Sequence, residues 1–104
     1  MSIIIIHCTC PNIVTAEQIS RLLVSQKLAA CVNQVSNVTS VYEWQGKIKQ
    51  DNEVLLLIKT ETEKFTAVSE AIREVHPYEL PELIAVSVTQ GEPNYLEWIK
   101  QCTK

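Results

Sequence analysis

Apolar residues recur along this chain with two different periods, and the first quarter of the sequence shows both. Residues 2–10 contain four consecutive isoleucines, a β-branched run that favours a buried strand ending before Pro11. Residues 15–18 read Thr-Ala-Glu-Gln, which is the capping-box pattern of a helix start. An apolar stripe with helical spacing follows at residues 19–23. The pattern therefore predicts a buried strand followed by an amphipathic helix.

The next apolar positions predict a long hairpin. Residues 32–44 read as one irregular strand, Gln45-Gly46 provides a turn, and residues 47–60 read as the return strand. The return strand begins polar and finishes as Val-Leu-Leu-Leu-Ile at residues 54–58. We therefore expect the tip of the hairpin to be exposed to solvent and its base to be buried. It is longer than a usual strand of about five or six residues. Because a long projecting hairpin is unsafe in a monomer, we expect a partner there.

A second capping-box pattern, Thr-Glu-Thr-Glu at residues 60–63, begins a second predicted helix. Its apolar stripe has the i, i+3, i+7, i+10 spacing of an amphipathic helix and consists of Phe65, Val68, Ile72 and Val75. Pro77 lacks an N–H and disfavours helical geometry at the residue before it. The helix should therefore end at or just before His76.

The last third of the chain predicts a strand and a short helix. Residues 83–88 are mostly β-branched or aliphatic, which is typical of a strand covered on both faces. The stiff connection at residues 76–82 brings a histidine, a tyrosine and two carboxylates to the end of this strand. After a turn at residues 91–93, residues 94–102 predict the final helix.

Strand, helix, strand, strand, helix, strand is the order of two split βαβ units, and it predicts one α+β domain over residues 1–104. The simplest arrangement is a ferredoxin-like sandwich of four antiparallel strands with both main helices on one face. In that topology the first and third strands are central, and the last strand, residues 83–88, lies at an edge. An edge strand that is apolar on both faces needs cover from another chain, so the pattern predicts an oligomer.

Composition and charge disfavour several functions. Hydrophobic residues make up 46% and charged residues 20% of the chain, as expected of a compact globular domain. The formal net charge is −3 and the basic residues do not cluster, which disfavours binding of nucleic acid or of an anionic membrane. The isoleucine run is too short for a signal peptide or a membrane span. Cys8 and Cys10 are too close for an easy disulfide, so the four cysteines are interpreted as reduced thiols of a cytosolic protein.

The chain lacks the residues that two other functions of this fold require. An acylphosphatase-like enzyme needs an arginine in a phosphate-cradling loop after the first strand, whereas residues 9–12 read Thr-Cys-Pro-Asn. No nucleophile–base pair is evident, so we expect no enzymatic activity. An RNA-binding sheet displays aromatic residues on its central strands in a basic setting, and residues 3–6 and 54–58 offer neither.

Several short motifs occur in a specific order over nearly the whole chain. They are Cys8-Thr9 with Pro11, residues 27–32 (Lys-Leu-Ala-Ala-Cys-Val), residues 42–47 (Tyr-Glu-Trp-Gln-Gly-Lys), Glu53, residues 58–60 (Ile-Lys-Thr), residues 76–78 (His-Pro-Tyr), Pro81-Glu82 and residues 95–99 (Tyr-Leu-Glu-Trp-Ile). In these motifs the chain resembles the CutA family of divalent-cation tolerance proteins. The resemblance implies a cytoplasmic homotrimer of ferredoxin-like subunits, similar in architecture to the PII signalling proteins. It also implies a link to copper tolerance and metal binding, without an established enzymatic activity.

The resemblance implies metal ligands as well: the cysteine that ends the first strand, a histidine pair before Pro-Tyr, and a nearby glutamate. In this chain Cys8, His76 and Glu82 match them, while Val75 stands in the place of the first histidine. Copper favours thiolate and imidazole, and a carboxylate is a harder and weaker ligand for Cu(I). With one ligand absent, we expect a weak or shared site for copper or another divalent ion, and no obligatory cofactor.

Other interpretations of these residues stay open. Cys8 can be a small buried hydrophobe, and His76 can be a helix-end residue that bonds the last carbonyls. Cys8 and Cys10 share one face of an extended strand, which suits a soft metal, but the Cys-x-x-Cys loop of copper chaperones with this fold is absent. Cys31 and Cys102 are interpreted as fillers of the core or of an interface.

The alternative function is that of a PII-like signalling trimer, in which clefts between subunits bind a small-molecule effector or a protein partner and metal binding is incidental. Polar residues beside apolar strands are the candidate cleft residues: Glu53, Lys59, Tyr78, Glu79 and Glu82. Four aromatic residues are interpreted as anchors of a subunit interface rather than as a stacking platform, given the acidic charge: Tyr42, Trp44, Tyr95 and Trp98.

Overall fold

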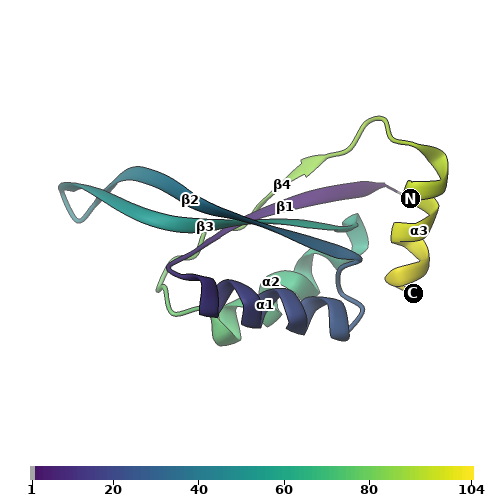
Figure 1. Ribbon diagram of the computed structural model, residues 1–104, viewed down its shortest axis with the longest axis horizontal. Helices are drawn as coiled ribbons and strands as arrows, with labels where there is room; N and C mark the ends of the chain where they lie inside the picture. Colours follow the sequence, from purple (N-terminus) through teal and green to yellow (C-terminus); the bar gives the residue numbers. More distant parts are fainter. Residues whose placement is uncertain (1) are drawn as a thin grey trace.

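The computed structural model describes residues 2–104 and has the predicted ferredoxin-like fold with an added C-terminal helix (Figure 1). Its elements are β1 (Ile3–Cys10), α1 (Ile13–Ser25), β2 (Cys31–Trp44), β3 (Lys47–Glu61), the 3₁₀ turn η1 (Thr62–Lys64), α2 (Phe65–Val75), β4 (Ile84–Ser87) and α3 (Pro93–Cys102). The strands form one antiparallel sheet in the order β2-β3-β1-β4. Helices α1 and α2 lie together on one face of it (Figure 1). The predicted topology is confirmed, including the edge position of the last strand.

Both main helices begin at other residues than the capping patterns indicate. The side chain of Asn12 caps α1 by accepting a hydrogen bond from the Thr15 N–H at 2.9 Å. The predicted capping box at residues 15–18 is therefore wrong, because an earlier residue already satisfies the free N–H groups. The second predicted capping box is wrong because Thr60 stays in β3, where its hydroxyl donates to the Leu28 carbonyl at 2.7 Å. α2 instead follows η1 and has no side-chain cap.

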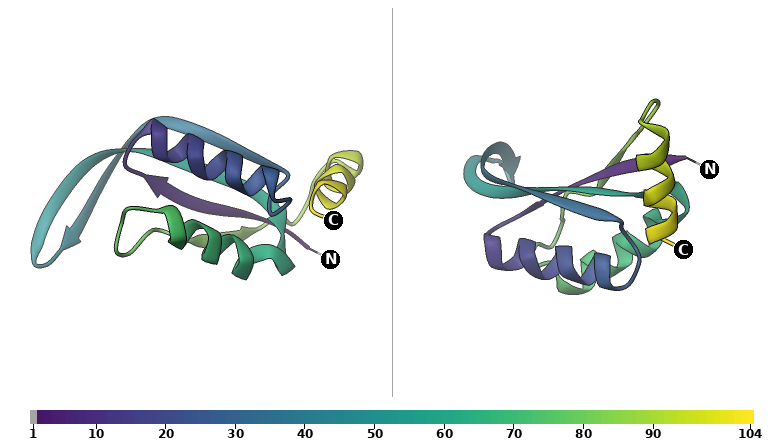
Figure 2. Two further views of the ribbon diagram at one scale, coloured as in Figure 1. Left: turned by 90° about the horizontal axis from the view of Figure 1, so that it is seen from below. Right: turned by 45° about the vertical axis from the view of Figure 1, so that its right-hand side comes forward.

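Strands β2 and β3 form the predicted long hairpin. Its turn residues Gln45 and Gly46 have φ angles of 52° and 80°, the left-handed pair typical of a type I′ turn. A bulge between Val35 and Val38 shifts the register of β2, and Asn37 adopts a positive φ of 62° there. Because a bulge bends its strand and increases the twist, the outer part of the hairpin curves away from the rest of the sheet (Figure 2).

Helices α1 and α2 cover one face of the sheet along β1 and the second half of β3. By the two-residue period of a strand, the even-numbered side chains of β1 and of residues 54–60 share this face, and they are buried. The main core consists of Ile4, Ile6, Cys8, Cys10, Val54, Leu56 and Ile58 from the sheet, Ala16, Ile19 and Leu23 from α1, Ala29, and Val68 and Ile72 from α2.

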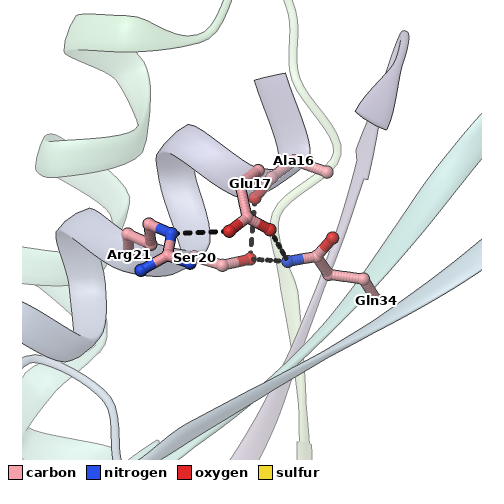
Figure 3. Close-up of polar contacts among 5 residues, drawn as sticks. All are labelled: Ala16, Glu17, Ser20, Arg21 and Gln34. Atoms are coloured by element: carbon pink, nitrogen blue, oxygen red, sulfur yellow. Dashed lines mark hydrogen bonds and ion pairs between the residues drawn. The ribbon is translucent and has the colours of Figure 1, made fainter. Parts of the chain in front are cut away.

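A polar network fastens α1 to the edge strand β2 (Figure 3). The side-chain amide of Gln34 donates to Glu17 Oε2 at 3.1 Å and to Ser20 Oγ at 3.2 Å. Arg21 forms an ion pair with Glu17 one helical turn away. These two partners, Gln34 first and Arg21 second, lower the pKa of the Glu17 carboxyl. Since the ion pair is exposed, the network orients the helix more than it stabilises the fold.

The opposite face of the sheet is only partly covered. Among residues 2–104, only α3 packs near it, at the end of the sheet where Ile99 contacts Ile3 and Ala30 (Figure 1). On the edge strand β4, Ile84 and Val86 are 58% and 51% exposed. The odd-numbered side chains in the middle of this face are half-buried: Ile5, His7, Leu55 and Leu57. We call this side of the sheet the open face.

Candidate metal centre and the adjoining groove

Two cysteines from β1 and a histidine from the end of α2 meet under the covered face. Cys8 and Cys10 are two residues apart on one strand, so both side chains point into the core, where both are fully buried. His76 follows α2 with φ −77° and ψ 132°, the extended geometry that Pro77 favours in the residue before it. The two sulfurs and a ring nitrogen all lie within 4.8 Å of one another. We call these three residues the thiol–imidazole cluster.

Hydrogen bonds determine the orientation and the tautomer of the His76 ring. Nδ1 accepts a hydrogen bond from the Tyr78 N–H at 3.1 Å, so the ring proton of the neutral imidazole lies on Nε2. Nε2 donates this proton to the Thr9 carbonyl at 2.8 Å. His76 does cap the helix end, since its backbone N–H donates to the Ile72 carbonyl, but its ring bonds β1 rather than the last carbonyls of α2.

The two thiols influence each other and are screened from water. The neighbouring Cys10 thiol, burial, and the negative charges of Glu82 and Glu53 all raise the pKa of Cys8. The interaction with Cys8 lowers the pKa of Cys10. Cys8 is therefore a protonated thiol at neutral pH, and a metal ion that binds it must displace a proton.

The other two residues from the sequence-based ligand comparison lie outside the cluster. Glu82 is exposed on the connection between α2 and β4, although it is near enough for its charge to affect the Cys8 thiol. Val75, in the place of the first histidine, packs against the main core. The structure thus brings Cys8 and His76 together with Cys10, and it leaves Glu82 beside them at the surface.

An open groove of about 990 Å³ adjoins the cluster between the hairpin and the connection after α2. Four of the five candidate cleft residues line it, whereas Lys59 lies apart, with its ammonium group 5.9 Å from the ring centre of Tyr95. The four residues are Glu53, Tyr78, Glu79 and Glu82. Aromatic side chains from the hairpin also line the groove, namely Tyr42 and Trp44. The groove is acidic and partly aromatic.

A buried carboxylate forms the inner wall of this groove. Glu53 is only 6% exposed, and its Oε2 accepts a hydrogen bond from the Tyr78 hydroxyl at 2.7 Å. Burial, followed by this hydrogen bond, raises the pKa of Tyr78, so the phenol keeps its proton. The pair links β3 to the connection that carries His76, and the Tyr78 ring lies against the His76 ring with 4.8 Å between the ring centres.

The donor set of the cluster fits a soft metal ion. Thiolate and imidazole are ligands that Cu(I) and Zn(II) prefer, whereas Ca²⁺ and Mg²⁺ require several oxygen ligands. Sequence reasoning treated Cys10 as a weak signal, although its i, i+2 spacing from Cys8 was visible. It missed the Thr9 carbonyl that holds His76, because a backbone carbonyl leaves no trace in the residue types.

Comparison with known proteins connects this fold to a family. A family model described as CutA1 divalent ion tolerance protein matches residues 4–102. "Protein CutA" of Mus musculus is 51% identical over 96 residues, which are 92% of this chain and 54% of that protein. "Divalent-cation tolerance protein CutA" of Thermus thermophilus is 40% identical over 99 residues, which are 95% of this chain and 96% of that protein. The chain thus spans about half the length of the mouse relative.

Solved structures agree with these matches. The crystal structure of CutA from Xylella fastidiosa superimposes with a TM-score of 0.97 at 45% identity, and the match covers 100% of both chains. The crystal structure of CutA1 from Oryza sativa superimposes with a TM-score of 0.97 at 39% identity, covering 100% of this chain and 95% of that one. Among the described residues, the helices are too short or too polar to cross a membrane.

Proposed function

The chain belongs to the CutA1 divalent ion tolerance family, and we propose that it acts as a cytoplasmic, non-enzymatic homotrimer that binds copper ions. The observation that carries this proposal is the approach of the Cys8 thiol and the His76 imidazole in a buried pocket. Both are ligands that copper favours. Exposed Glu82 would supply a carboxylate beside the pocket, where a positive ion first meets the protein.

Copper titration calorimetry on the Cys8→Ser variant tests this role. Loss of the sulfur should weaken copper binding strongly, because a hydroxyl is a poor ligand for a soft ion. Cys31→Ser is the matched control, since Cys31 is a free thiol outside the cluster. Equal copper affinity in the wild type and in Cys8→Ser would show that the assignment of Cys8 is wrong.

Two open edges and the open face support the homotrimer. Strands β2 and β4 are the edges of the sheet, and their outer backbone groups are free to pair with another chain. Pairing β4 of one copy with β2 of the next is a head-to-tail contact, which forms a ring if its rotation closes. Three copies are the number that the family resemblance implies. Static light scattering should give three times the mass of one chain at micromolar concentration, and a stable monomer would contradict the proposal.

The cytoplasmic assignment is supported by the cysteines. All four are free thiols, and none of them forms a disulfide within residues 2–104. Free thiols that persist are typical of a reducing compartment. Thiol quantification in protein extracted from cells under acid quench should give four reduced cysteines per chain, and a disulfide in that material would argue for an oxidising location.

The groove favours a second candidate function, that of a PII-like trimer with a small-molecule effector. Its volume of about 990 Å³ is at the upper end of ligand pockets, and it contains the buried Glu53 carboxylate. Because acidic residues line it, the effector would be a small cation. Putrescine is a suitable probe: it should raise the melting temperature of the wild type and have less effect on Glu82→Gln. No shift at millimolar putrescine would remove this candidate.

A further inference from the structure

We propose that Cys10 is a ligand of the metal centre, so that this chain binds monovalent copper through Cys8, Cys10 and His76. The inference rests on the proposed function, because it concerns the same pocket. It differs in the ligand set, since the family resemblance assigns Cys8, His76 and Glu82 but not Cys10. It also differs in the ion, since it replaces a divalent cation with Cu(I).

The first argument is geometric. Three atoms that lie within 4.8 Å of one another can all lie within about 2.8 Å of one point, while metal–sulfur and metal–nitrogen bonds are about 2.3 Å and 2.0 Å. The gap that remains is about 0.5 Å for sulfur and about 0.8 Å for nitrogen. The backbone of both cysteines is held by β3, where Cys8 pairs with Leu56 and Cys10 pairs with Val54. The donors are therefore nearly arranged before a metal arrives.

The second argument concerns the imidazole. A metal-binding histidine commonly donates its other ring N–H to a backbone carbonyl, which fixes the tautomer and the ring orientation. In His76, Nε2 donates to the Thr9 carbonyl and the lone pair lies on Nδ1, so Nδ1 is the nitrogen that can bind an ion while this bond stays in place. An ion bound at Nδ1 would take the place of the Tyr78 N–H. Tyr78 is half-buried, so water can satisfy that N–H instead.

The third argument is the number and softness of the donors. Among the described residues, no fourth Cys, His, Asp or Glu belongs to the cluster. Structural zinc sites have four protein ligands, and hard divalent ions need oxygen ligands in higher number. Cu(I) is soft and is satisfied by two or three ligands, so two sulfurs and one nitrogen complete its coordination. Both cysteines are fully buried, which leaves little room for the waters that a divalent ion would retain.

Cys10 thus supplies the donor that Val75 cannot. Val75 has an aliphatic side chain packed against the core, and Glu82 is an exposed oxygen ligand outside the cluster. In this chain the second sulfur on β1 takes over the role of a second ligand from the α2 end. The site becomes richer in sulfur, which shifts its preference from divalent ions towards Cu(I).

The test is Cu(I) binding to the full chain under anaerobic, reducing conditions, measured by competition with a chromogenic Cu(I) chelator. Cys10→Ser and Cys10→Ala should each weaken Cu(I) binding by more than about 100-fold, which exceeds the loss from an outer hydrogen-bond partner. Cys31→Ser should bind like the wild type. Far-UV circular dichroism and the melting temperature show whether each variant is folded. X-ray absorption of the wild type, which needs no variant, should give two sulfurs and one nitrogen per copper.

Each outcome bears on one of the two proposals. One sulfur per copper in the wild type, or unchanged Cu(I) affinity in folded Cys10→Ala, would overturn the role of Cys10 and leave copper binding at Cys8 intact. Zn(II) binding as tight as Cu(I) binding would overturn the preference for the monovalent ion. A wild type that binds neither Cu(I) nor Cu(II) would overturn the proposed function itself.

Discussion

The two faces of the sheet are built from the same strands but have different surroundings. On β3, Leu56 and Ile58 point to the covered face and are fully buried, whereas Leu55 and Leu57 point to the open face and are half-buried. All four residues are about equally apolar. The difference therefore comes from the two helices, which cover only one side. A single chain completes one face of this fold and leaves the other only partly covered.

The same contrast separates the two candidate sites. The thiol–imidazole cluster lies on the covered face, where water is excluded and soft ligands are protected. The groove opens to solvent, and its wall carries carboxylates such as Glu79 and Glu82. The two sites therefore suit different cations. The buried cluster suits a soft metal ion, and the solvent-exposed groove suits a hydrated or organic cation.

Truncation on the covered face should have the largest effect. Ile58→Ala removes a fully buried side chain of β3 from the main core and leaves a cavity, so it should lower the free energy of unfolding by about 2–5 kcal/mol. Urea denaturation measures this loss. The control is Ile48→Ala near the hairpin tip, where the side chain is 82% exposed and the change should stay within about 0.5 kcal/mol. Equal losses in the two variants would contradict the contrast.

Tyr78→Phe tests the buried carboxylate beside the groove. It removes the hydroxyl that donates to Glu53, and the loss of a hydrogen bond to a charged group should cost about 1.5–3 kcal/mol. Because folding raises the pKa of Tyr78, the wild type has its full advantage below the unfolded pKa of about 10 and loses it as the pH rises further. Urea denaturation of both proteins should thus show a gap that is constant at neutral pH and shrinks in strong alkali.

The control for this variant is Tyr95→Phe, since the Tyr95 hydroxyl has no hydrogen-bond partner within residues 2–104. It should change stability little at any pH. A gap between wild type and Tyr78→Phe that stays the same above pH 10 would refute the link between the phenol and the carboxylate.

Leu57→Ala sharpens the comparison, because Leu57 is the neighbour of Ile58 on the opposite face. In an isolated chain the half-buried side chain should contribute about 1 kcal/mol. If copies of the chain cover this face, its contribution grows with association, which stabilises folded chains by mass action. The difference in melting temperature between wild type and Leu57→Ala should therefore widen from nanomolar to micromolar protein. If this difference in melting temperature does not change with protein concentration, the open face has no partner.

The hairpin turn should give the smallest effect. Gly46 has a φ of 80°, and an added Cβ would contact nothing within 4 Å, so Gly46→Ala suffers only the backbone penalty of about 1 kcal/mol. Thermal unfolding of Gly46→Asn should give a smaller loss, because asparagine tolerates this conformation better. The same loss for alanine and asparagine would point to a cause other than the left-handed backbone.

Much of the fold could be predicted because its signals are local. The β-branched run of β1, the apolar stripe of α2 and the proline after His76 each act on neighbouring residues. Strand β1 forms as expected, and α2 ends at Val75, just before His76. The helix starts were mispredicted, because the groups that compete for a capping side chain are close in space but can be distant in sequence. The Thr60 hydroxyl, for example, donates to the Leu28 carbonyl, which is 32 residues away in the sequence.

The sequence by itself determined the order of the elements, the residues of each strand that share a face, and the edge position of the last strand. Only the tertiary structure decided which face the helices cover, and therefore that Cys8 and Cys10 are buried with His76 while Glu82 stays outside. The contact that orients His76 spans 67 residues. Periodicity reports the direction of a side chain relative to its own strand or helix, but the neighbours it meets depend on how distant elements pack.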